Sequence, residues 1–154
     1  MVDNSINSTC TVIRADCKCF DVLTEEQKEL LDKKQVEVKY RKGEIIAKYG
    51  AFASHIIFLC DGLVKVYMED NDQTLILKII GPGSLVGLNA LSEEGDTFRY
   101  TAAAYQESLA RLIDINTFKY LIRENGIFAS RIISIMSENA NLINNRFFFM
   151  TRRQ

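Results

Sequence analysis

The feature that most restricts the fold of this sequence is a long stretch near its end without glycine or proline, from Phe128 to about Arg152. Apolar side chains recur in it every three or four residues, which is the period of an α-helix. At 1.5 Å per residue the helix would be roughly 35 Å long. One small domain cannot cover a helix of that length, so we expect part of it to meet another chain.

Two apolar sets follow this predicted helix. The first is predicted to form the seam of a homodimer, in which one Asn fixes the register as buried Asn does in coiled coils: Ile132, Met136, Asn139, Ile143, Phe147 and Met150. The second set is expected to pack on the rest of the chain and includes Phe128, Ile135, Leu142 and Phe149. The alternative is a helix that only covers its own domain. Its length, and three successive phenylalanines pointing in three directions, favour the dimer.

The middle of the chain, from Val36 to Asp114, changes to short runs that are typical of β-strands. The expected strands cover 36–40, 45–47, 55–60, 63–68, 74–80, 100–104 and 109–115. Turn residues separate them at Lys42-Gly43, Asp61-Gly62 and Asp70-Asn71-Asp72, and Asp61-Gly62 is the strongest hairpin prediction. This spacing predicts a compact antiparallel roll or barrel.

Helical segments flank the strands. Thr24 with Gln27 three residues later matches a capping box, which predicts a helix over about 24–34. A shorter helix is expected over 116–123. Residues 1–20 lack periodicity, so we divide the chain into a loose cysteine-containing segment (1–20), a roll domain (21–124) and the long helix (125–154).

The bulk composition restricts the function classes. A chain of 154 residues with 47% hydrophobic content suits one core, and a net charge of -1 provides no field that attracts a polyanion. No apolar run approaches the roughly 20 residues that span a bilayer, and the polar first ten residues do not form a secretion signal. We therefore expect a cytoplasmic protein with no membrane partner and with reduced cysteines.

Several short motifs occur in a characteristic order: Arg41-Lys42-Gly43-Glu44, Tyr49-Gly50-Ala51, the run from Ile57 to Val66, Gly81-Pro82-Gly83, Val86-Gly87 and then the long helix. Over residues 20–152 this order resembles the Crp/Fnr transcription regulators. The resemblance implies a mainly β fold with α, namely a double-stranded β-helix (a jelly-roll-like β-roll), flanked by an N-terminal helix and a long C-terminal dimerisation helix. It also implies that DNA is contacted only through a winged helix-turn-helix, which is absent from this chain.

The resemblance places the effector site at Gly87, Leu88, Arg99, Tyr100 and Thr101, with Asn144 from the helix. Members that bind cyclic nucleotides have a glutamate after the glycine, which holds the ribose, and an arginine that clamps the phosphate. Here Leu88 follows Gly87, and an unpaired ligand hydroxyl would cost about 1–3 kcal/mol. We expect Arg99 to be an exposed strand-edge residue. Cyclic AMP is thus disfavoured, and the small-molecule effector and any cofactor stay unknown.

The four cysteines are the remaining candidate ligands: Cys10, Cys17, Cys19 and Cys60. Four thiolates suit an iron–sulfur cluster in number, but the single residue between Cys17 and Cys19 suits neither a cluster nor zinc. We therefore expect no metal, free thiols near the N-terminus and one buried Cys60. The only histidine, His55, is a weak basis for haem binding.

Catalysis is not expected. Metal-dependent chemistry in related β-helices needs two or three histidines, and the sequence has neither a Gly-x-Ser-x-Gly motif nor a Ser-His-Asp set. One alternative stays open, which is a stand-alone cyclic-nucleotide-binding or thiol or iron–sulfur redox-sensing module. The length of the last helix favours a sensor that passes an effector signal to DNA-binding domains.

Overall fold

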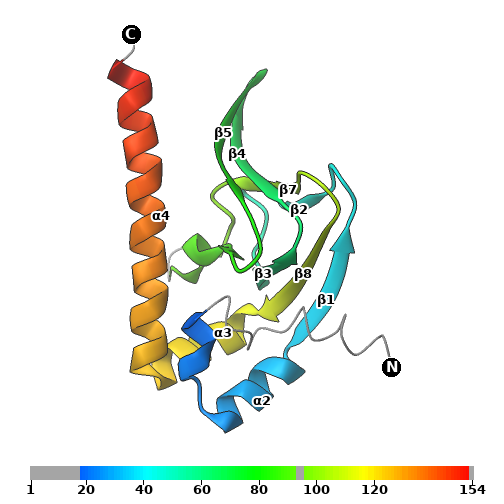
Figure 1. Ribbon diagram of the computed structural model, residues 1–154, viewed down its shortest axis with the longest axis vertical. Helices are drawn as coiled ribbons and strands as arrows, with labels where there is room; N and C mark the ends of the chain where they lie inside the picture. Colours follow the sequence, from blue (N-terminus) through cyan, green and yellow to red (C-terminus); the bar gives the residue numbers. More distant parts are fainter. Residues whose placement is uncertain (1–17, 93–95, 153–154) are drawn as a thin grey trace.

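Two four-stranded antiparallel sheets form the body of the molecule, with helices at one end and one long helix alongside (Figure 1). The computed structural model describes residues 18–92 and 96–152, with side chains between 19 and 140. The first sheet has the order β1 (Gln35–Tyr40), β8 (Ser108–Asp114), β3 (His55–Asp61) and β6 (Leu85–Val86). The second has the order β2 (Ile45–Ala47), β7 (Thr101–Ala104), β4 (Val64–Asp70) and β5 (Gln73–Ile80).

The helical elements are η1 (Lys18–Val22), α2 (Glu25–Lys33), η2 (Leu88–Leu91), α3 (Ile115–Glu124) and α4 (Gly126–Arg152). The predicted strands and the three predicted α-helices lie within about two residues of these bounds. The short elements η1, β6 and η2 were not predicted, because two to five residues carry too little periodicity. The jelly-roll-like roll with a long C-terminal helix is confirmed.

The strand pairing connects distant parts of the sequence. β1 pairs with β8, so that Gln35 lies opposite Ile113. β3 is covered on both faces, since Ile56, Ile57, Phe58 and Leu59 are all buried. This explains why β3 is a continuous apolar run and does not alternate.

The prediction of a hairpin at Asp61-Gly62 is wrong. β3 pairs with β6 and β8, whereas β4 pairs with β5 and β7, so this turn carries the chain from one sheet to the other. Gly62 has a φ of +102°, and a Cβ there would lie 2.7 Å from the Glu107 carbonyl oxygen. The glycine is therefore needed for a sheet crossing and not for a hairpin.

A tight hairpin occurs instead at Asn71-Asp72, between β4 and β5. Asp70 lies opposite Gln73, and Asn71 has a φ of +55°, a conformation that Asn tolerates better than most residues. Figure 1 shows this hairpin extending away from the roll on the side of α4. The hairpin therefore forms one wall of the space beside the helix.

Four phenylalanines hold the helices to the end of the roll and are here called the aromatic cluster: Phe20, Phe58, Phe118 and Phe128. Each is at most 3% exposed. The ring centroids of Phe20 and Phe58 are 5.8 Å apart, and those of Phe118 and Phe128 are 5.4 Å apart. Such edge-to-face and tilted ring pairs are favourable beyond their buried area.

The aromatic cluster corrects the expected boundary of the N-terminal segment. Cys19 is 2% exposed and Phe20 is fully buried, so the fold begins in η1 and not after residue 20. Two large residues placed before any periodic pattern gave no indication of their burial.

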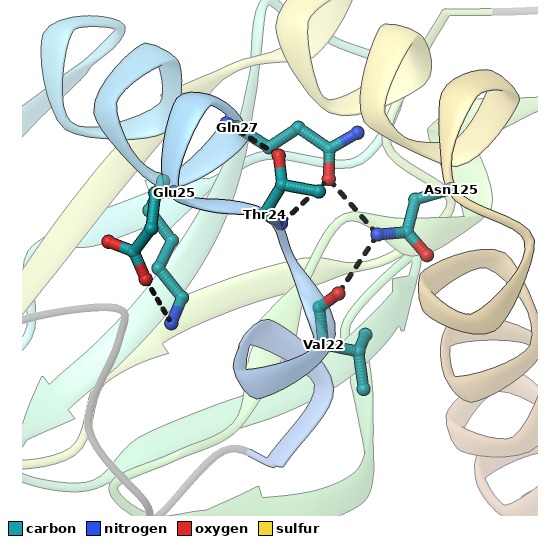
Figure 2. A network of polar contacts seen from close by, with 6 residues as sticks. Val22, Thr24, Glu25, Gln27 and Asn125 are labelled. Carbon is teal, nitrogen blue, oxygen red and sulfur yellow. Dashed lines mark hydrogen bonds and ion pairs between the residues drawn. The ribbon is translucent and has the colours of Figure 1, made fainter.

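A polar network fixes the start of α4 next to the aromatic cluster (Figure 2). The Asn125 side chain donates through Nδ2 to the Val22 carbonyl and to Gln27 Oε1, at 3.0 Å each. Its Oδ1 accepts from the Phe128 amide at 3.0 Å. Thr24 and Gln27 form the predicted capping box of α2 in the same network, which confirms that prediction. Asn125 thus ties η1, α2 and α4 together.

The first half of α4 packs along the roll, and its second half runs on the same side as the β4–β5 hairpin (Figure 1). Phe128 and Ile132 are buried against the chain's own core, with Ile135 and Met136 partly buried beside them. None of the helices in the described part of the chain has the length and hydropathy needed to cross a lipid bilayer.

Candidate functional site

A cavity of about 590 Å³ lies between the roll and α4. Its roll side is formed by residues of β4, β5, β6 and η2 and by Tyr100, and its other side by α4. Its walls are mainly aliphatic, with a few polar groups: Val66, Lys78, Leu85, Leu88, Asn89, Tyr100, Ile133, Met136, Ser137, Asn139 and Ala140.

A second cavity, of about 480 Å³, adjoins the first towards α3. The two share Asn89, Ile133 and Met136. Its other walls come from η2, α3, α4 and Arg99. A ligand seated between roll and helix would therefore have an elongated space.

Between residues whose side chains the structure describes, one hydrogen bond joins the roll to α4 across the first cavity. Lys78 Nζ on β5 donates to Asn139 Oδ1 on α4 at 2.8 Å, and both residues are half-buried. Burial lowers the pKa of Lys78 from its usual value of 10.5, because the low-dielectric wall disfavours the charged form. The ammonium has three donors, so two remain for other partners.

Two of the predicted effector residues, Leu88 and Tyr100, line this cavity. The Gly87 amide donates to the Tyr100 hydroxyl at 3.0 Å. Burial raises the pKa of Tyr100 above its usual 10.0, while the hydrogen bond from Gly87 acts in the opposite direction. Leu88 is 4% exposed and contributes a methyl surface at the position where a ribose-binding glutamate was expected. The floor is thus apolar, and its loop amide is already occupied.

The structure brings Gly87, Leu88 and Tyr100 together but separates the other predicted effector residues. Arg99 is exposed and lines only the second cavity. Thr101 is buried, and its hydroxyl accepts from the Tyr49 amide at 3.1 Å, which is a structural role. The side chain of Asn144 lies outside the described residues.

The predicted dimer seam is corrected at one position. Ile132 is 2% exposed within the single chain, so it belongs to the core and has no surface left for a second helix. Met136 and Asn139 face the roll as well, although both retain some exposure. The side chains of Ile143, Phe147 and Met150 lie outside the described residues, and a seam there stays a prediction.

The cysteines lie in different places. Cys19 is buried in the core, and Cys10 and Cys17 lie outside the described residues. Cys60, half-buried on β3, is disulfide-bonded, so the expectation of a reduced thiol there is wrong. Among the described residues, no group of three or more His, Cys, Asp or Glu side chains lies close enough to hold a metal ion.

Sequence reasoning missed the polar groups that line the cavity above its floor. Lys78 is the only charged residue in the otherwise apolar run 75–80. A single charge in such a run was the sequence feature that could have identified it as a site residue. Asn89 gave no signal of its own. Asn139 was identified as a special position on the helix, and within the single chain its Oδ1 accepts a hydrogen bond from Lys78 Nζ.

Comparison with known proteins gives the family. Residues 37–125, more than half of the chain, match the profile of the cyclic nucleotide-binding domain. A cGMP-dependent protein kinase of Plasmodium berghei is 33% identical over 72 residues, which are 47% of this chain and 8% of the kinase. The chain therefore spans a small part of that relative.

Solved structures share the fold. The sensor domain of the transcriptional regulator DNR from Pseudomonas aeruginosa superposes with a TM-score of 0.71 at 19% identity, covering 82% of this chain and 88% of that one. A CooA mutant from Carboxydothermus hydrogenoformans gives 0.69 at 19% identity and covers 86% and 84%. The Thermus thermophilus catabolite activator protein gives 0.69 at 19% identity and covers 86% and 62%.

These matches confirm the resemblance to Crp/Fnr regulators that the ordered motifs indicated. The roll, the cavity beside α4 and the matching profile agree, and the chain belongs to the cyclic nucleotide-binding domain family, with the fold of the sensor domains of transcription regulators.

Proposed function

We propose that this chain is the sensor and dimerisation part of a Crp/Fnr-type transcription regulator and that it has no catalytic activity of its own. A small effector binds between the roll and α4 and changes the position of the helix. The observation that carries the proposal is the cavity that the Lys78–Asn139 hydrogen bond spans, since an occupant there touches both parts at once. A helix-turn-helix beyond the chain would then receive the signal.

The proposed dimer rests on the length of α4 and on its exposed apolar residues. Ile133 is 62% exposed on the half of α4 whose side chains are described, and the apolar residues that follow suit a second helix. Two of the similar structures are the sensor domain of a transcriptional regulator and a catabolite activator protein, which favours this role over an isolated binding module.

The test has two arms. Sedimentation equilibrium of this chain should give a dimer, and a monomer at high concentration would overturn the dimerisation part. The product of the native gene, with whatever follows Gln154, should bind a palindromic operator in a mobility-shift assay, and the affinity should change with the effector. A gene that ends at Gln154, or a product without sequence-specific DNA binding, would overturn the regulator part.

A second candidate is a cyclic-nucleotide-binding module of the kind found in kinases. The 72-residue match to the cGMP-dependent kinase favours it. Buried Leu88 and exposed Arg99 disfavour it, because among the described residues that line the cavities there is no carboxylate for the ribose and no buried guanidinium for the phosphate. Calorimetry with cyclic AMP and cyclic GMP distinguishes the two, since saturable micromolar binding would support the module.

A further inference from the structure

We infer that the effector is an amphipathic carboxylate, whose head group pairs with Lys78 and whose apolar body lies along Leu85, Leu88 and Met136. The inference rests on the proposed function and names the chemical class that the same cavity takes. Its first support is the charge of the cavity wall.

Lys78 is a cation without a neutralising partner in the described part of the chain. The ion pairs found there involve Lys28, Arg111 and Lys119, and no carboxylate of a described residue lies within 4.0 Å of Lys78 Nζ. Among the described residues that line the two cavities there is no Asp or Glu. A half-buried ammonium with one neutral acceptor and two spare donors therefore favours an anion in the cavity.

The head group is better matched by a carboxylate than by a phosphate. A phosphate is usually held by several donors, among them loop amides and arginines. Here the Gly87 amide already donates to Tyr100, and Arg99 is exposed and lines only the second cavity. One ammonium with two spare donors suits the single charge of a carboxylate, and the Asn139 side chain lies next to it.

The body of the ligand is constrained by the rest of the wall. Val66, Leu85, Leu88, Ile133 and Met136 present aliphatic surface around Lys78. A sugar placed on this surface would leave its hydroxyls without partners, at a cost of about 1–3 kcal/mol for each buried group. An alkyl or aryl chain would gain free energy by leaving water there.

The binding mode also explains how the ligand would act on α4. The carboxylate takes the two spare Lys78 donors while its apolar body contacts Met136 and Ile133 of the helix. The bound ligand therefore adds contacts between the roll and α4, which the Lys78–Asn139 hydrogen bond joins directly. Loss of the Lys78 charge should weaken binding without removing the cavity.

The test measures binding to the whole 154-residue chain by calorimetry with three probes. The probes are octanoate, the neutral octanamide of equal length, and cyclic AMP. Octanoate should bind saturably at one site per chain, with octanamide weaker by about tenfold, the usual loss for one charged hydrogen bond. Lys78→Met should reduce the affinity for octanoate to that for octanamide. Lys39→Met, which removes the same charge from exposed β1, should change neither affinity.

A charge-preserving variant protects the test against misfolding. Lys78→Arg should retain octanoate binding within a few fold, and the thermal midpoint of each variant shows whether it folds. If Lys78→Met does not fold, the octanoate to octanamide ratio in the wild type still tests the inference. The ratio should fall towards one as the pH rises towards 10.5 and Lys78 loses its proton.

The outcomes separate the inference from the proposed function. Equal affinities for octanoate and octanamide, unchanged by Lys78→Met, would overturn the inference that the effector is a carboxylate. The proposal that an effector binds in the cavity would be unaffected. Cyclic AMP binding more tightly than octanoate would overturn the inference and support the nucleotide module. A dimer that binds its operator and takes none of the three probes would overturn the inference alone.

Discussion

The long helix α4 contacts the rest of the molecule in two contrasting ways. At its start, the aromatic cluster and the Asn125 network fill the contact with buried rings and three hydrogen bonds. Around Asn139 the contact contains a cavity of about 590 Å³ and, among the described side chains, the Lys78–Asn139 hydrogen bond. The first contact fixes the helix, and the second leaves it sensitive to whatever occupies the space. A helix that is held firmly at its start and borders a cavity further along can change its position when a small ligand fills that cavity.

The largest expected effect comes from emptying the aromatic cluster. Phe118→Ala removes a fully buried ring that contacts Phe20 and Phe128, so we expect a loss of about 3–5 kcal/mol in the free energy of unfolding. Urea unfolding followed by circular dichroism measures it. Tyr120→Ala on the same helix, where the ring is 43% exposed, is the matched control and should cost far less. Equal losses for the two variants would contradict a packed base.

The Asn125 network should matter less, though clearly. Asn125→Ala removes the cap of α4 and the two bonds to Val22 and Gln27, and we expect a loss of about 2 kcal/mol in the free energy of unfolding. Asn125→Asp retains an acceptor for the Phe128 amide and loses only the donated bonds, so its loss should be intermediate. The same urea titration measures both. An aspartate variant as unstable as the alanine variant would show that the cap itself contributes little.

Substitutions beside the cavity around Asn139 should cost less stability than those in the aromatic cluster or the Asn125 network. Asn139→Leu leaves the Lys78 ammonium without its acceptor and should cost about 1 kcal/mol of stability, while the Lys78→Met, Asn139→Leu double variant should cost less than that. A double-mutant cycle by urea unfolding gives the coupling. A loss at Asn139 as large as that at Phe118 would remove the contrast between the two contacts.

The smallest expected effect is a pH dependence at Lys78. Its folded-state pKa is lowered below 10.5 by burial, so between that lowered pKa and 10.5 the unfolded chain binds more protons than the folded one. Stability from this group therefore rises with pH in that window, and the penalty of burying the charge is fully present below it. Wild type should gain stability relative to Lys78→Met as the pH increases from 7 to 10. A constant difference across this range would show that Lys78 is solvated like a surface lysine.

The roll and its helices were largely predictable because period and turn chemistry are local properties of the sequence. Thr24 and Gln27 marked the start of α2, and the uninterrupted run after Phe128 marked α4. Strand partners are not local, which is why Asp61-Gly62 suggested a hairpin although the turn links two sheets. The crowding of Gly62 against Glu107 depends on a strand 45 residues away along the chain and has no signature near the turn.

The site was predictable only in part, for the same reason. Gly87, Leu88 and Tyr100 were singled out through ordered motifs, and Leu88 and Tyr100 line the cavity. Lys78 and Asn139 are 61 residues apart, and neither residue type indicates the other. Ile132 was assigned to the seam because helical spacing alone does not distinguish a face on the chain's own roll from a face on a second helix.

The pairing of β1 with β8 also has a consequence for the order of folding. In this pairing Gln35 lies opposite Ile113 and Tyr40 opposite Ser108, and the bond between Asn125 and Val22 spans a sequence separation of 103. Chains dominated by such distant contacts fold slowly, typically in milliseconds to seconds. During synthesis the hydrogen-bonding edge of β1 stays unoccupied until β8 has left the ribosome. The charged side chains of Glu37 and Lys39 on β1 disfavour pairing of this unoccupied edge with other strands.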